Sequence, residues 1–143
     1  AVANGESYDG NGVSLDAFVK ALKDCVGSLP GRTLIIASAD LSHAGPSFGD
    51  QQTLAGEAPE ADAARKKVFQ HDMQMLELFR NNKPGELVAS MAWQQNPTRW
   101  CSTGNMVATL LTVEPKQIEL LNYAASIDPQ GAAMVSSASA AMW

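Results

Sequence analysis

Asp40 and His43 are the first residues whose types and spacing suggest chemistry, because two residues separate them just after an apolar run. A carboxylate at this spacing can orient the imidazole, fix its tautomer or share a metal ion with it. A histidine titrates near neutrality, with an ordinary pKa of about 6.5, so His43 can serve as ligand, base or acid. The structural alternative is that Asp40 caps a turn and His43 is a half-buried loop residue. Spacing alone leaves both interpretations open.

Cys101 is the second candidate, since it directly precedes an expected helix start at Ser102-Thr103-Gly104. Unpaired amides at a helix start favour anions and can lower a thiol pKa below about 8.5. The sulfur would then be a metal ligand, or a nucleophile with His43 as its base. The alternative is a small buried residue packed beneath Trp100. Cys25 we assign to a structural role near the buried side of the first helix.

The other candidate residues favour structural roles. His71 lies on the apolar stripe of a predicted helix, so we interpret it as a core or edge histidine. The six methionines are dispersed and are typical of core filler. The sequence has no phosphate-binding glycine loop, Cys-x-x-Cys pair or Gly-x-Ser-x-Gly elbow, and no elbow surrounds Ser42. The chemistry is therefore expected from Asp40, His43 and Cys101.

Apolar periodicity and turn residues predict the elements that must position these side chains. Helices are expected from Ser14 to the Pro30-Gly31 stop, from Asp62 to Asn81, from Gly85 to Trp93 and from Asn105 to Val113. The run 33–37 predicts a strand buried on both faces, and residues 44–60 predict a loop that can act as a lid. Residues 118–125 fit helix or strand, and residues 132–143 fit a closing strand.

A helix followed by a buried strand is half of a parallel-sheet unit, so the fold class expected is α/β. In open α/β sheets ligands gather beyond the carboxyl ends of strands, which is where Asp40 and His43 follow the 33–37 strand. Residues 1–13 predict a flexible N-terminal segment, and residues 14–143 predict the ordered part of one domain.

Composition limits the function classes. The chain has 143 residues, 45% hydrophobic and 17% charged, which is typical of a globular domain. With a net charge of −5 and scattered lysines and arginines, it offers no surface suited to nucleic acid or anionic lipid. No apolar run approaches the roughly 20 residues needed to span a bilayer. Two cysteines do not make a disulfide framework, so we expect both reduced and the protein cytoplasmic.

Three segments, in order, resemble the Memo family, also called AmmeMemoRadiSam system protein B. Residues 38–45, SADLSHAG, resemble its Ser-Ser-Asp-x-x-His-aromatic-Gly segment. Residues 98–104 resemble its Asn-Thr-x-Cys-Gly stretch, and residues 120–131 its Leu-x-Tyr-Ala-x-Ser-x-Asp-x-x-Gly segment. Ala39, Ala44 and Ser102 depart from these patterns, which indicates a divergent subgroup. The last match also favours a strand at 118–125 that enters a closing C-terminal hairpin.

The resemblance implies the C-terminal half of an α/β domain, similar in fold to class III extradiol ring-cleaving dioxygenases. Such a fold has a central, largely parallel or mixed sheet flanked by helices, with a pocket at its strand ends. By the same resemblance Cys101 is a ligand for a divalent metal such as iron, copper or zinc. Asp40 and His43 line that pocket, where His43 would be a second ligand or an acid/base group.

Family members also use two histidines from the N-terminal half, so the metal site in this chain alone is expected to be incomplete. We therefore expect a partner: a segment preceding Ala1 in the same protein, or a companion chain. The expected function is a metal-capable pocket related to the ring-cleaving dioxygenases, with the reaction left open. The alternative is a non-catalytic protein that uses the same cleft to hold a peptide, a metabolite or a metal.

Overall fold

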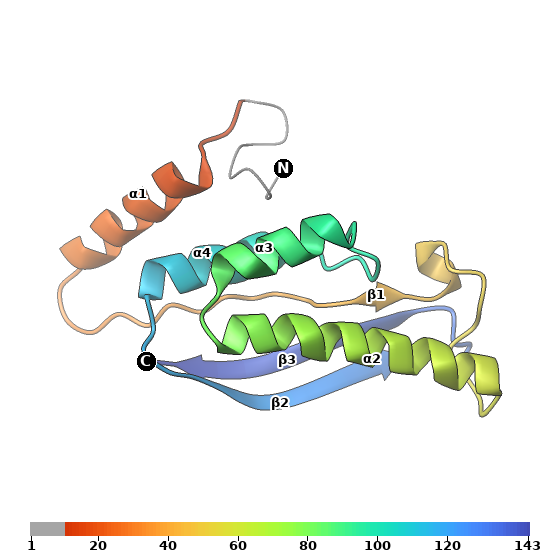
Figure 1. Cartoon of the computed structure of the whole chain (residues 1–143). Helices are drawn as coiled ribbons and strands as arrows, with labels where there is room; N and C mark the ends of the chain where they lie inside the picture. The colour runs from red at the N-terminus through yellow and green to blue at the C-terminus, as the bar shows by residue number, and fades with distance from the viewer. Residues whose placement is uncertain (1–10) are drawn as a thin grey trace.

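A computed structural model describes residues 11–143, which form an α/β fold of four α-helices and a three-stranded sheet (Figure 1). In chain order the elements are α1 (Leu15–Ser28), β1 (His43–Ala44), the 3-10 helix η2 (Pro46–Phe48), α2 (Pro59–Arg80), α3 (Pro84–Trp93), α4 (Thr103–Val113), β2 (Ile118–Ile127) and β3 (Met134–Met142). The α/β class is thus confirmed. Most of the predicted 1–13 segment, residues 1–10, lies outside the described residues.

All four helices were predicted, with ends that differ by a few residues, because their start signals are local. The Ser14 hydroxyl accepts a hydrogen bond from the Ala17 amide at 3.2 Å and caps α1. Pro59 and Pro84 occupy the first turns of α2 and α3, where a missing N–H leaves no bond unmade. No helix within residues 11–143 has both the length and the apolarity to cross a membrane.

The C-terminal hairpin forms as expected, with β2 and β3 paired antiparallel from Ile118↔Met142 to Ile127↔Met134. A bulge between Leu120 and Asn122 shifts the register by one residue. Side chains alternate between the faces of a strand, so this extra residue moves Tyr123, rather than Asn122, onto the face of Ile118 and Leu120. The bulge therefore aims the Tyr123 phenol at helix α2, where its hydroxyl meets Asp72.

The strand predicted at residues 33–37 is wrong. These residues form no ladder and run as an irregular segment from α1 to β1 (Figure 1), with Leu34 and Ile36 81% and 80% exposed. The sheet of the described residues has the order β1-β3-β2 and is antiparallel throughout, so a central parallel sheet is not seen. An apolar run becomes a buried strand only when another strand lies beside it, and residues 11–143 supply none there.

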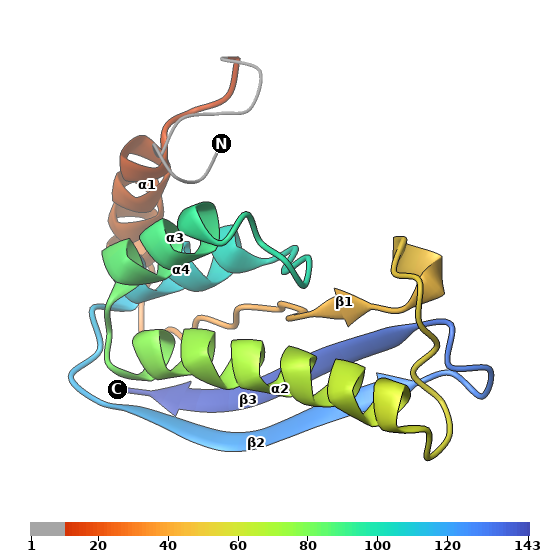
Figure 2. The same cartoon turned by 45° about the vertical axis from the view of Figure 1, so that its right-hand side comes forward.

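The main core lies where α2, α3 and α4 meet the inner face of the hairpin. Figure 2 shows α3 and α4 side by side on one side of β1, with α2 crossing β2 and β3. The most deeply buried apolar side chains of this core are Met75, Leu87 and Leu110. Helix α1 packs against α4 and buries only Val19 fully. Cys25 is accordingly exposed, so its predicted place near a buried edge is wrong.

The 44–60 loop is fastened to the hairpin turn rather than standing free of it. Leu54 is buried, and its amide donates to the Gly131 carbonyl at 2.8 Å. Gly131 has a φ of +68°, and a Cβ there would clash with the backbone nitrogen of Ala55. Only glycine therefore satisfies both the left-handed backbone and the close approach of the loop.

We expect Gly131→Ala to lower the free energy of unfolding by about 2 kcal/mol or more, because backbone strain and a backbone clash add together. Gly85→Ala is the matched control: nothing lies near its Cβ position in α3, and alanine there should stabilise the protein by roughly 0.5–1 kcal/mol. Urea unfolding of both variants measures the difference. Equal stability of the two variants would contradict the close approach at Gly131.

Candidate metal centre

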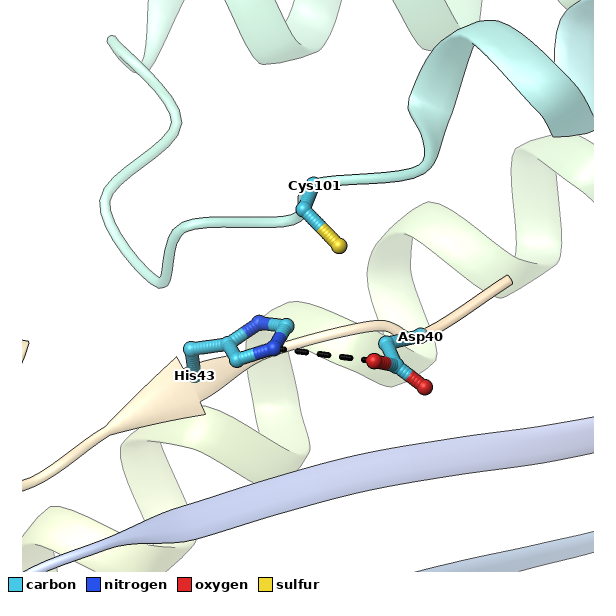
Figure 3. Close-up of side chains that lie close together, drawn as sticks. All are labelled: Asp40, His43 and Cys101. Carbon is cyan, nitrogen blue, oxygen red and sulfur yellow. Dashed lines mark ion pairs between the residues drawn. The ribbon is translucent and has the colours of Figure 1, made fainter.

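Asp40, His43 and Cys101 come together from two segments far apart in the sequence. One ligand atom from each side chain lies within 4.8 Å of the corresponding atoms of the other two. In Figure 3 the Cys101 sulfur points toward the space between the His43 ring and the Asp40 carboxylate. The three residues selected from the sequence are thus adjacent in space, while the roles predicted for them remain predictions.

The hydrogen bonds of His43 define its tautomer. Its Nδ1 atom lies 3.2 Å from the Leu41 carbonyl oxygen and 3.1 Å from the Arg99 carbonyl oxygen. Carbonyl oxygens only accept hydrogen bonds, so Nδ1 carries the proton when the ring is neutral. Nε2 then presents a lone pair, and it lies 3.8 Å from an Asp40 carboxylate oxygen. This is the arrangement in which a histidine is ready to bind a metal or accept a proton.

The three side chains differ in exposure. The His43 side chain is 17% exposed and its ring packs edge-on against Phe48, with centroids 5.2 Å apart, while the Asp40 side chain is 59% exposed. Cys101 is exposed as well, so the buried alternative for it is wrong. Trp100, not Cys101, fills the core below, and Cys101 lies two residues before the start of α4. The cluster is therefore rigid on its His43 side and open to solvent on the others.

Arg99 joins the histidine segment to the 44–60 loop. Its guanidinium donates to the His43 carbonyl at 3.1 Å and forms an ion pair with Asp50 at 2.7 Å. The hydrogen bond from Arg99 lowers the pKa of the Asp50 carboxyl below its ordinary value. Arg99 adopts a positive φ of 59°, which turns its carbonyl toward His43 Nδ1. No local pattern in the sequence points to this residue, because its role depends on contacts with His43, more than fifty residues away.

A buried carboxylate, Asp72 of α2, lies beneath the cluster and was not selected from the sequence. It is 0% exposed and accepts hydrogen bonds from Ser42, Trp100, Tyr123 and Ser136. A signal did exist. Asp72 falls on the apolar stripe of its helix with Val68, His71, Met75, Leu76 and Phe79. A carboxylate on such a stripe must find several donors or remain out of the core.

His71 is a core histidine, as predicted. Its Nδ1 atom lies 2.8 Å from the Thr98 hydroxyl, and its ring packs edge-on against Trp100. Nε2 is buried and has no hydrogen-bond partner among the described residues. Burial lowers the pKa of His71 below the ordinary 6.5, only partly opposed by the neighbouring Asp72 charge. The ring is therefore held neutral in the folded protein.

Two cavities lie near the cluster without including it. One, of about 340 Å³, is mostly apolar and lies between residues 34–41 and β3, with Phe79 and Met106 in its wall. The other, of about 460 Å³, is bordered by Lys67, Asp50 and Arg99. Because Arg99 also contacts His43, the second cavity shares a wall with the candidate metal centre.

A Memo-like protein family model matches residues 11–142, which is nearly the whole chain. The chain belongs to the Memo-like family. No significant match was found among curated proteins or solved structures. The match confirms the family that residues 38–45, 98–104 and 120–131 of the sequence indicated.

The neutral state of His71 predicts a pH-dependent stability. As pH falls below about 6.5, the unfolded chain binds a proton at this position more readily than the folded chain, so the free energy of unfolding decreases until the lower pKa of the folded state is reached. The slope from this one group is at most about 1.4 kcal/mol per pH unit. We expect urea midpoints to drop between pH 7 and pH 5.5, and the drop to be smaller in His71→Asn, which keeps a donor for Thr98. An equal drop in both proteins would assign the pH dependence elsewhere.

Proposed function

We propose that this Memo-like protein binds a divalent metal ion between Asp40, His43 and Cys101. The observation that carries the proposal is the combination of their mutual distances, within 4.8 Å, with the orientation of the His43 ring. Both carbonyl contacts fall on Nδ1, so the Nε2 lone pair is directed to the same space as the sulfur and the carboxylate. Membership of the Memo-like family does not by itself establish this metal site, so the proposal rests on the geometry of the three side chains.

The donor set fits such an ion. A metal binds imidazole nitrogen and carboxylate oxygen at about 2.0–2.2 Å and thiolate sulfur at about 2.3 Å, so its ligand atoms lie roughly 3–4 Å apart. Small side-chain rotations of the exposed Asp40 and Cys101 would close the present separations. A thiolate and an imidazole select zinc, copper or iron over magnesium and calcium. The Nδ1 bonds of His43 supply the orientation that metal-bound histidines usually have.

A metal held there would act as a Lewis acid toward an oxygen-bearing ligand. Three protein ligands would leave the solvent side of the ion free for that ligand or for further side chains. His43 and Cys101 would hold the ion, and Asp40, whose side chain is 59% exposed, would bind it or accept a proton. The cavity beyond Arg99 offers room for the ligand close to the same histidine.

The site would be completed by a companion segment, either from the same protein or from a separate chain. Residues 33–37 support this. Leu34 and Ile36 are exposed, and this run forms no backbone–backbone hydrogen bond within residues 11–143. Unpaired amides and carbonyls beside apolar side chains are the surface that an added strand covers. The segment continues directly into Asp40 and His43, so a strand placed here can bring further ligands, which we propose to be histidines, to the metal.

A ring-cleaving dioxygenase activity and a non-catalytic role both remain compatible with a metal pocket. The resemblance to class III extradiol dioxygenases supports the first. The donor set supports the second, because non-haem iron oxygenases use two histidines and one carboxylate, whereas a cysteine lies in this cluster. Oxygen uptake by the metal-loaded protein in the presence of catechols distinguishes the two roles. Binding of catechols without oxygen uptake would favour the non-catalytic role, in which the protein holds a metabolite, a peptide or the metal itself.

We expect Cys101→Ser and His43→Ala each to weaken zinc binding at least about 100-fold, because each removes a ligand atom rather than an outer contact. Competition against a chromophoric chelator measures the affinity. Cobalt substitution adds a thiolate charge-transfer band that Cys101→Ser should abolish. Cys25→Ser is the matched control, since Cys25 is also exposed but belongs to α1. Unchanged metal affinity in all three variants would end the metal proposal.

For the companion segment, we expect the polypeptide that supplies it, whether from the same protein or from a separate chain, to bind this chain and to slow hydrogen exchange at residues 33–37. Leu34→Lys together with Ile36→Lys should abolish the binding without changing stability by more than about 0.5 kcal/mol, since both side chains are exposed. Trp93→Lys is the control, because Trp93 is 86% exposed at the end of α3. If the two polypeptides fail to associate, or if Trp93→Lys disrupts them equally, this surface is not the docking site.

A further inference from the structure

The Asp72 carboxylate is tied to both segments that carry the candidate metal ligands. One oxygen accepts from the Ser42 hydroxyl at 2.5 Å and from the Trp100 indole at 2.6 Å. The other accepts from the Tyr123 hydroxyl at 2.7 Å and from the Ser136 hydroxyl at 2.5 Å. Ser42 immediately precedes His43, and Trp100 immediately precedes Cys101. One Asp72 oxygen atom thus links the side chains of Ser42 and Trp100, the residues that directly precede His43 and Cys101.

Each surrounding hydroxyl has one proton to donate, and the resulting chain of hydrogen bonds runs toward the Asp72 carboxylate. Ser42 has a single hydroxyl proton, which it gives to Asp72, so it accepts from the Thr98 hydroxyl at 2.6 Å. Thr98 in turn accepts from His71 Nδ1 at 2.8 Å. This order leaves His71 Nε2 as a bare acceptor, which agrees with its lack of a partner and with its lowered pKa. The direction of the chain is set by the charge at its end.

The residues fixed by Asp72 adjoin the two carbonyls that hold His43 Nδ1. Leu41 precedes Ser42 and Arg99 precedes Trp100, and both of their carbonyl oxygens contact Nδ1. A displacement of Ser42 or Trp100 would move these carbonyls as well, because each carbonyl shares one planar peptide unit with the amide of the following residue. The His43 amide, which donates to the Thr98 carbonyl at 2.7 Å, completes the same frame.

We infer that Asp72 is a positioning residue that selects the Nδ1–H tautomer of His43 and so keeps Nε2 available as a ligand or base. A neutral histidine in water prefers the proton on Nε2, so the protein must supply the two carbonyls to reverse that preference. Asp72 supplies them indirectly, by fixing the segments to which they belong. The consequence for metal binding rests on the proposed function, whereas the tautomer itself does not.

Asp72→Asn is the discriminating substitution, because it keeps the shape of the side chain and replaces one accepting oxygen with an NH₂ group. Either Ser42 and Trp100, or Tyr123 and Ser136, would then face a donor instead of an acceptor. Ser42→Ala is the second variant, since it removes the link to His43 while leaving three donors on Asp72. Leu87→Ala is the control for loss of stability alone, because Leu87 is buried in α3 in the same core but has no polar side-chain atom to join this hydrogen-bond network.

The tautomer is measured by nitrogen-15 NMR of the imidazole rings at a pH where both histidines are neutral. The chain has two histidines, so His71→Asn assigns both sets of signals. In the wild type we expect protonated Nδ1 and unprotonated Nε2 for His43. In Asp72→Asn and Ser42→Ala we expect the proton to move largely to Nε2, and zinc affinity to fall about 10–100-fold. Leu87→Ala should retain the wild-type tautomer.

The outcomes separate this inference from the metal proposal. A wild-type Nδ1–H signal that persists in a folded Asp72→Asn or Ser42→Ala variant overturns the positioning role, whatever the metal affinity. If Asp72→Asn does not fold, Ser42→Ala alone decides by the same criterion. A tautomer that shifts as expected in a protein without measurable zinc affinity supports the positioning role and refutes the metal proposal. A wild type with the proton on Nε2 of His43 refutes the inference directly.

Discussion

The buried charge of Asp72 is the constraint on which the rest of the structure depends. Removing a carboxylate from water costs several kcal/mol, and the protein offsets this only by surrounding it with donors of good geometry. Those donors come from the segment before β1, the loop before α4, and strands β2 and β3. These elements, although distant in the sequence, must therefore meet at the Asp72 carboxylate. Removal of any donor would leave the charge under-satisfied, so the network specifies where the hairpin must lie against α2.

The same network explains why the candidate metal centre is ordered on one side and open on the other. Below the cluster, Ser42 and Trp100 are buried and hydrogen-bonded, and His43 is held by its ring and its backbone. Above it, Asp40 and Cys101 face solvent with no comparable support. A metal ligand needs a fixed histidine more than a fixed cysteine or carboxylate, because the ring must present one particular nitrogen. The ordered side of the cluster is therefore the side of His43, the residue whose orientation matters most for metal binding.

Features that depend on residues close together in the sequence could be predicted, whereas features that depend on contacts between distant residues could not. Helix α1 followed from a serine cap and a spacing of apolar residues, because these signals lie within the element itself, whereas the β2–β3 hairpin followed chiefly from the family resemblance. The strand predicted at residues 33–37 is wrong for the opposite reason: the run is apolar, but a strand forms only beside another strand. Asp40, His43 and Cys101 could be selected by residue type and family motif. Arg99 and Ser136 could not, since nothing near them in sequence indicates a partner fifty or more residues away.

The exposed run at residues 33–37 and the candidate metal centre are neighbours along the chain. Both lie along one continuous segment, with unpaired backbone and exposed Leu34 and Ile36 at its start and the exposed Asp40 carboxylate near its end. A single added strand would bury the two apolar side chains, at about 25 cal/mol per Å² of area removed from water, and would approach the metal centre from its open side. Burial at one end of the segment would then supply the free energy that orders ligands at the other. Metal binding and association would be coupled, so that each strengthens the other by the same factor.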